Sequence, residues 1–256
     1  AKLTEVSRYV SELANLPPVT RQPYVGSSAF AHKAGLHVSG LAKWEESYQH
    51  INPELVGNQS GVLVSELSGV SSIIYKAKER GLDLPRGEEA RRILEQVKLM
   101  ESRGFQYEGA EASFELLVRH AQSDYRPPFE LVDFMVVVER RRRPAASGEE
   151  ILAEATVKVK VGDQVIHTAS EGNGPVDALD KALRKALVEF YPRLAQVKLM
   201  DYKVRILDES AGTEAQVRVL IESTDGEQEW TTVGSSTNII EASWLALADS
   251  LEYWLV

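Results

Sequence analysis

Cysteine is absent from this chain of 256 residues, which excludes disulfide scaffolds, thiolate zinc sites and cysteine nucleophiles. The absence is compatible with a reducing compartment, so we expect a cytoplasmic protein. Long apolar runs are missing too, since none approaches the roughly 18 to 20 residues of a membrane span. The amino terminus lacks the basic and then apolar pattern of a secretory signal, and it reads like the middle of a longer protein.

Basic residues are in the minority, with 29 Lys and Arg against 38 Asp and Glu and a formal net charge of -9. The field of such a surface repels nucleic acid and anionic membranes, so we expect neither as a partner. The one basic run, Arg140–Arg143, precedes Pro144 and is most simply a solvated strand end. The chain does have a hydrophobic share of 43%, which is enough for a sizeable core in one or two domains.

The first half has the periodicity of helices. Apolar residues recur every three or four positions over residues 3–16, and two prolines end that pattern. Glycines then interrupt residues 27–81 too often for long elements, whereas further helices are predicted over 86–104 and 111–120. We take residues 1–125 as a helical linker region.

After residue 125 the apolar period falls from about 3.6 to 2, which is typical of strands. Strands are predicted over 129–138, 155–161 and 164–169, with a glycine turn between the last two. A helix follows over 176–190, where Gly, Asn and Pro stand at its start. Residues 126–256 therefore begin with a strand-strand-strand-helix unit.

The same unit occurs twice along the chain, at an offset of 60 to 68 residues. We therefore predict an α+β fold in which helical linker subdomains precede a duplicated βββα domain with pseudo-twofold symmetry. Symmetric halves commonly associate as dimers, so we expect a homodimer. The matching blocks are 131–134 with 199–202, 154–161 with 214–221, and 177–190 with 241–254.

The histidines do not form a recognisable metal site. His32 and His37 are five positions apart across Gly35, which a helix does not align as a metal pair, and no third ligand stands at a suitable spacing. A histidine standing alone is most often a structural or surface residue. We expect no metal and no cofactor in this chain.

Two small-residue turns stand at the start of the two repeated helices. Neither has the glycine fingerprint of a nucleotide-binding loop or the lysine of a P-loop. Their residues either cap the helices or offer bare backbone N–H groups to a small carboxylate, which would make an effector site. The candidate effector-binding residues are Gly172, Asn173, Gly174 and Pro175 in the first turn, and Gly234, Ser235, Ser236, Thr237 and Asn238 in the second.

Four motifs carry a family resemblance that covers essentially the whole chain. Residues 26–37 (GSSAFAHKAGLH) and 48–58 (YQHINPELVGN) resemble the segment after the catalytic barrel in the α-isopropylmalate synthase and citramalate synthase family. Residues 172–179 and 230–244 resemble that family's C-terminal regulatory domain. The sequences of residues 64–69 and of the segment that begins with Trp230 are most similar to the citramalate synthase branch.

The resemblance implies an acyltransferase reaction in the parent protein. The acetyl group of acetyl-CoA condenses with a 2-keto acid, which is pyruvate in the citramalate branch, and hydrolysis of the thioester follows. A divalent metal in a TIM barrel polarises the keto group. An eight-stranded barrel takes about 250 residues, which do not fit beside the repeats. We therefore expect the barrel to be absent and this chain alone to be inactive.

By the same resemblance, His37 and Tyr48 match two linker residues that enter the partner subunit's barrel and take part in catalysis. A histidine can relay a proton, and a tyrosine hydroxyl can donate to an oxyanion. Glu54 is a weaker candidate, and His32 is expected to be structural. Residues 34–81 are rich in glycine and are the expected hinge.

The regulatory end implies binding of a pathway end product. The resemblance implies isoleucine as feedback inhibitor for the citramalate branch and leucine for the isopropylmalate branch. The sequence leaves both open, and it does not identify the 2-keto acid. The main alternative is a free-standing amino-acid-binding module, against which the His37 and Tyr48 motif argues, because a pure sensor has no use for those residues.

Overall fold

The computed structural model describes residues 2–14, 19–32, 37, 40–41, 43–44, 47–62, 69–82, 84, 87–142 and 149–256. The chain divides into two compact units, Ala1–Glu101 and Ser102–Val256, which are described separately below. Parts of the predicted family motifs, including most of 64–69, lie outside the described residues.

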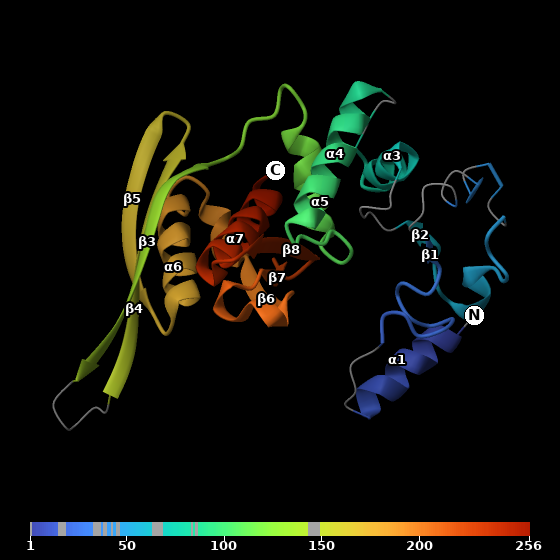
Figure 1. Ribbon diagram of the computed structural model, residues 1–256, viewed down its shortest axis with the longest axis horizontal. Coiled ribbons are helices and arrows are strands. Elements are labelled where there is room, and N and C mark those ends of the chain that lie inside the picture. The colour runs from blue at the N-terminus through green and yellow to red at the C-terminus, as the bar shows by residue number, and fades with distance from the viewer. Residues whose placement is uncertain are drawn as a thin grey trace. The chain divides into compact units, whose positions relative to one another are not determined.

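The first unit consists of helices and short connections, as predicted. In α1 the side chain of Thr4 is buried and donates a hydrogen bond to the Val56 carbonyl at 2.8 Å. The apolar stripe of the same helix is exposed, up to 71% for Leu13. The unit contains, in chain order, α1 (Leu3–Leu13), β1 (Ala31–His32), the 3-10 helix η1 (Pro53–Val56), β2 (Gly61–Val62), α3 (Val70–Glu79) and α4 (Glu88–Ser102), with β1 and β2 paired in parallel (Figure 1).

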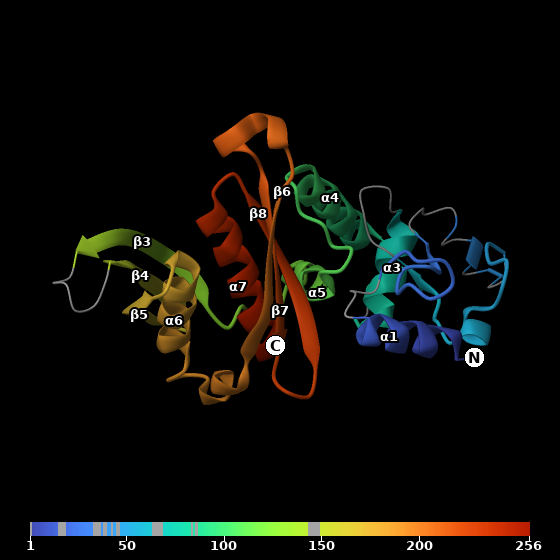
Figure 2. The same cartoon turned by 90° about the horizontal axis from the view of Figure 1, so that it is seen from below.

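The second unit is the duplicated α+β domain. Two antiparallel three-stranded sheets, ordered β3-β4-β5 and β6-β7-β8, are each followed by one helix. The two helices α6 and α7 lie between the sheets (Figures 1 and 2). The elements are α5 (Glu111–His120), β3 (Glu130–Arg142), β4 (Glu149–Val161), β5 (Gln164–Gly172), α6 (Pro175–Leu187), η2 (Pro192–Gln196), β6 (Lys198–Ile206), η3 (Glu209–Glu214), β7 (Val217–Thr224), β8 (Glu229–Ser236) and α7 (Ile239–Leu255).

Hydrogen bonds at equivalent positions confirm the duplication. Thr168 on β5 donates to the Ala182 carbonyl of α6 at 2.7 Å. Sixty-four residues later, Thr232 on β8 donates to the Ala246 carbonyl of α7, also at 2.7 Å. The first strand of each sheet has a register shift at the same place, between Leu131 and Asp133 in β3 and between Leu199 and Asp201 in β6. The predicted βββα order is therefore confirmed, and no barrel is present in the described ranges.

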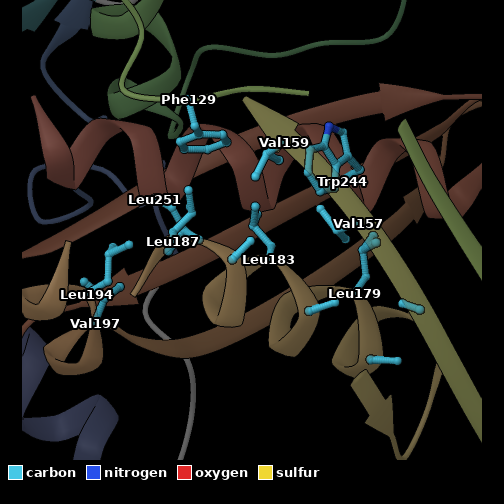
Figure 3. Packing of buried hydrophobic residues seen from close by; sticks show 14 of the residues in the cluster. Phe129, Val157, Val159, Leu179, Leu183, Leu187, Leu194, Val197, Trp244 and Leu251 are labelled. Carbon is cyan, nitrogen blue, oxygen red and sulfur yellow. The ribbon is translucent and has the colours of Figure 1, made fainter. Parts of the chain in front are cut away.

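The core of the second unit is shared between the two repeats. Leu179, Leu183 and Leu187 on α6 are fully buried against the inner face of β4 (Figure 3). Trp244 on α7 joins the same cluster and stacks on Phe134 of β3, with ring centroids 5.3 Å apart. Each buried side chain of this size contributes about 1.5–3 kcal/mol. The repeats therefore stabilise each other and form one domain.

The second unit begins at Ser102, earlier than the boundary at residue 126 that the sequence indicated. The reason is α5, which packs against α7 and the edge strand β8. Ser113 on α5 donates to Asp249 at 2.7 Å and accepts the N–H of Val233 at 3.0 Å, so it satisfies an edge group of the sheet. None of the helices in the described ranges has the length and apolarity needed to cross a bilayer.

Candidate functional site

The two residues predicted to be catalytic lie together in the first unit. The rings of His37 and Tyr48 stack with centroids 4.2 Å apart and an interplanar angle of 24°. Gly40 permits this arrangement, since a Cβ there would lie 2.6 Å from Tyr48 Cε2. Tyr48 remains 45% exposed, so its ring combines a packed face with access for an approaching group. The stack thus presents an imidazole and a phenol side by side.

His32, which was expected to be structural, contacts this stack. Its backbone is fixed in β1, where it pairs with Val62 of β2. Its ring meets the ring of His37 edge to face, with centroids 6.2 Å apart. Burial lowers the pKa of His32, and the neighbouring His37 lowers it further. His32 therefore stays neutral near pH 7 and supports the His37 ring without adding a charge.

A second aromatic group, which the sequence analysis missed, surrounds His50. The His50 ring lies between Tyr24, at a centroid distance of 5.6 Å, and Phe30, at 6.4 Å. The amide of Asn58 donates to the carbonyls of Tyr24 and Gly26 and so closes the loop. The positions of Tyr24, Phe30 and His50 in the sequence show that aromatic rings are present in this segment. Their spacing does not predict which of these rings contact one another. This group stiffens the segment that leads to His32.

Metal ligands do not gather in the part of the chain that the structure describes. No group of three or more His, Asp or Glu side chains there has a suitable arrangement for a metal ion. The His32 and His37 rings form a contact pair without a third ligand among those residues.

The first predicted effector turn leaves the start of α6 without a side-chain cap. Gly174 is the N-cap residue, and open space surrounds the position of its missing Cβ. The N–H of Asn173 is bound by the Asp177 carboxylate at 2.8 Å. A hydrogen bond from Lys181, assisted by that backbone group, lowers the pKa of Asp177. Gly172 is required because a Cβ there would lie 2.3 Å from the Ala178 nitrogen.

The second predicted effector turn is closed by its own groups. A Cβ on Gly234 would lie 2.0 Å from the Ala242 carbonyl oxygen. Ser235 is buried and donates to the Arg103 carbonyl at 3.0 Å. Ser236 accepts the N–H of Asn238 at 3.0 Å and donates to Glu241.

The Asn238 side chain of this second turn caps α7 by accepting the N–H of Ile240 at 2.9 Å. Thr237, the residue before it, is exposed. The two turns are therefore alike in sequence position and different in chemistry.

Comparison with known proteins gives the family. A family described as LeuA allosteric (dimerisation) domain matches residues 108–255, and one described as homocitrate synthase post-HMGL domain-like matches residues 24–104. The chain belongs to the LeuA allosteric (dimerisation) domain family. Its resemblance to the α-isopropylmalate synthase and citramalate synthase family is thereby confirmed.

Three curated relatives are informative. The chain is 54% identical over 99% of its length to "(R)-citramalate synthase" of Geobacter sulfurreducens and 49% identical over its full length to that of Aquifex aeolicus. It is 33% identical over 99% of its length to "(R)-citramalate synthase CimA" of Methanocaldococcus jannaschii. It spans about half the length of each, namely 48%, 48% and 49%.

The LeuA-type domain also contains a titratable cluster where α5 packs on α7. His120 Nε2 and the Tyr125 hydroxyl both lie 2.5 Å from Glu252 Oε1. Burial raises the pKa of Asp249 to about 7, although Ser113 donates to it. The hydrogen bond with Glu252 raises the pKa of His120, and burial raises that of Tyr125. No local pattern predicts this cluster, because its members come from segments far apart in the chain.

Two hollows open on the surface of the LeuA-type domain. One, of about 470 Å³, is lined in part by Asp180 and Arg184, which pair at 2.8 Å. The other, of about 390 Å³, lies where the Arg193 guanidinium covers the Trp254 ring at 5.2 Å from its centroid. The residues of the two predicted turns line neither hollow.

Proposed function

We propose that this chain is the linker and regulatory half of an acetyl-CoA-dependent synthase of the citramalate type. The parent reaction would convert acetyl-CoA, pyruvate and water to citramalate and CoA. The observation that carries the proposal is the LeuA-type duplicated domain together with relatives named (R)-citramalate synthase that match the chain from end to end. A 2-isopropylmalate synthase part that senses leucine is the second candidate, because the motifs resemble a family that includes both synthases.

The His37 and Tyr48 stack supports a catalytic role for the linker. We assign both side chains to the barrel mouth of a partner subunit, where His37 relays a proton and the Tyr48 hydroxyl donates to the oxyanion. The divalent metal belongs to that barrel and would polarise the keto group. The close ring contact favours this assignment over a free-standing sensor, since a histidine stacked on an exposed tyrosine has no evident use in amino-acid binding.

The first turn is the better place for the carboxylate of an effector. The first N–H groups of a helix lack partners within the helix and attract anions. In α7 the Asn238 side chain accepts one of these groups, the N–H of Ile240, whereas α6 begins at Gly174 with no side-chain cap and with open space beside it. We therefore assign isoleucine to Gly172–Pro175, and we assign a capping role to Gly234–Asn238. Leucine is the alternative effector.

Isothermal titration of the chain tests the proposal. Isoleucine or leucine should bind saturably and alanine should not, because alanine lacks the branched side chain that gains from burial. Heat changes for none of these amino acids would overturn the regulatory assignment.

Gly174→Asp tests the position of the effector site. The new carboxylate would cap α6 and repel the carboxylate of the ligand, so binding should weaken by about tenfold or more, as expected for loss of a charge-assisted hydrogen bond of about 1.5–3 kcal/mol. Thr237→Asp adds the same charge to the second turn and serves as the control. Equal weakening by both substitutions would show that net charge, and not the first turn, decides binding.

The proposal includes a cytoplasmic homodimer. The matched family is described as a dimerisation domain, and the lack of cysteine favours a reducing compartment. Sedimentation analysis of the chain should give about twice its mass of 28.4 kDa. A monomer at every concentration tested would contradict this part.

A further inference from the structure

A short segment near the start of the second unit is fixed to the second sheet of that unit. We call residues Arg103–Gln106 the strap. Gln216 and Ser235 both donate to the Arg103 carbonyl, at 2.8 and 3.0 Å. Arg218 Nε donates to the Gly104 carbonyl at 2.6 Å, and its Nη1 donates to Gln106 Oε1. Four hydrogen bonds therefore join three of the four strap residues to β7, β8 and the residue just before β7.

The strap lies on the face of the sheet that is turned away from α7. Val219 and Ile221 on β7 face α7, where they are buried with Ala242 and Leu247. Successive strand residues point to opposite faces, so Arg218 points to the other side. Ser235 pairs with Arg218 across the sheet and shares that side.

Gly104 fits the strap closely to the sheet. Its φ of +91° is rarely adopted by other residues. A Cβ there would also lie 2.5 Å from Ser235 Oγ and 2.7 Å from Leu207 Cδ1. The strap is therefore seated in one defined position on the second sheet.

No equivalent of the strap is found among the described residues of the first repeat. Thr156, Lys158 and Glu171 stand in β4 and β5 at the positions that correspond to Gln216, Arg218 and Ser235, by offsets of 60 and 64 residues. No other described element lies over this face of the first sheet in either view (Figures 1 and 2). The duplication therefore carries one added connection, and that connection belongs to the second sheet alone.

The strap stands at one end of a continuous chain of contacts from the proposed effector turn. Val176, in the first turn of α6 and two residues after Gly174, packs against the cluster that contains Val219 and Ile221 of β7. Arg218, next to Val219 in the same strand, holds the strap. The strap follows directly on Ser102, the last residue of α4.

We propose that the strap is the element through which effector binding at the start of α6 alters the end of α4. This inference rests on the proposed function, because it takes the effector site at the first turn as given. A ligand that reorders the first turn of α6 shifts Val176 against β7, and Arg218 carries that shift to the Gly104 carbonyl. Coupling of this kind requires that the ligand favour one of two arrangements of the strap.

Hydrogen exchange on the whole chain, with and without saturating isoleucine, tests the inference. In the unaltered chain, isoleucine should change the exchange rates of the strap amides and of the last turn of α4 by about fivefold or more. Arg218→Met keeps the apolar stem and removes both hydrogen bonds. In this variant isoleucine should bind with an affinity within about twofold of the original, and the response in α4 should be lost.

Two further variants complete the design. Lys158→Met makes the same kind of change at the corresponding position of the unstrapped sheet, and it should alter neither binding nor the response. Gln106→Met removes one strap acceptor without touching the sheet, so it should weaken the response even if Arg218→Met fails to fold.

The possible failures can be told apart. A response in α4 that persists in the folded Arg218→Met chain, or that is undiminished in the Gln106→Met chain, would overturn the role of the strap. Binding of isoleucine without any response in the unaltered chain would overturn the coupling and leave the proposed function in place. Absence of binding to the unaltered chain would overturn the proposed function and this inference with it.

Discussion

The α5 and α7 interface should lose stability as the pH rises, and Asp249 is the main cause. Burial raises the pKa of this carboxyl from 3.8 to about 7, so the folded protein binds the proton more tightly than the unfolded chain does. Stability from such a group is complete below pH 3.8 and is lost as the pH rises through about 7. The pKa of His120 is also raised, so its contribution is likewise lost with rising pH.

The size of the effect follows from the two pKa values. Each tenfold change in proton affinity is worth about 1.4 kcal/mol. With 3.8 in the unfolded chain and about 7 in the fold, the free energy of unfolding falls by about 2–3 kcal/mol between pH 5 and pH 8. The groups around Asp249 and His120 are Ser113, Glu115 and Arg119 on α5, Tyr125 after it, and Glu252 on α7.

Urea unfolding followed by tryptophan fluorescence can measure this change. Trp230, Trp244 and Trp254 lie in the second unit and Trp44 lies in the first, so the signal reports mainly on the LeuA-type domain. Asp249→Asn keeps an oxygen that accepts from Ser113 and removes the titration. The difference in unfolding free energy between the original and the variant should therefore shift by about 2–3 kcal/mol from pH 5 to pH 8. Parallel curves for the two proteins would refute the reasoning.

Three other changes have defined outcomes. Leu183→Ala should cost about 2–5 kcal/mol in urea unfolding, because the side chain is fully buried in the shared core; a loss below about 1 kcal/mol would contradict that packing. Thr168→Val and Thr232→Val should each lower the free energy of unfolding by about 1 kcal/mol, with the larger loss for the fully buried Thr232. A clear loss in only one of the two variants would contradict the equivalence of the repeats. In a full-length synthase with this C-terminal half, His37→Ala should lower turnover and leave isoleucine affinity unchanged, and unaltered turnover would remove the catalytic assignment.

Local patterns predicted the elements well where the periodicity was long. The helix expected over 86–104 is α4 at Glu88–Ser102, and the helix expected over 111–120 coincides with α5. The paired motifs also predicted the duplication, and the structure adds a pair of threonines outside those motifs that make the same hydrogen bond in both copies. These features are set by residues close together in the chain, so a single sequence contains them.

The candidate site was only partly within reach of the sequence. Motif resemblance identified His37 and Tyr48 as candidates. It did not predict that their rings stack or that the His32 ring contacts the His37 ring. The two turns looked equivalent because both contain small residues before a helix. The structure separates them, because a side chain caps α7 whereas none caps α6.

The order of residues is enough to show which faces of the helices and strands are apolar, that the βββα unit is repeated, and to which family the motifs belong. The place where α5 packs, the carboxyl that is buried beside it, and the attachment of the strap to the second sheet become visible only in the folded domain. The cause is distance along the chain. Ser113 and Asp249 are 136 residues apart, and Arg218 and Gly104 are 114 apart. Periodicity reports that a face is to be buried, whereas the partner that buries it is chosen by packing and hydrogen bonding in the folded domain.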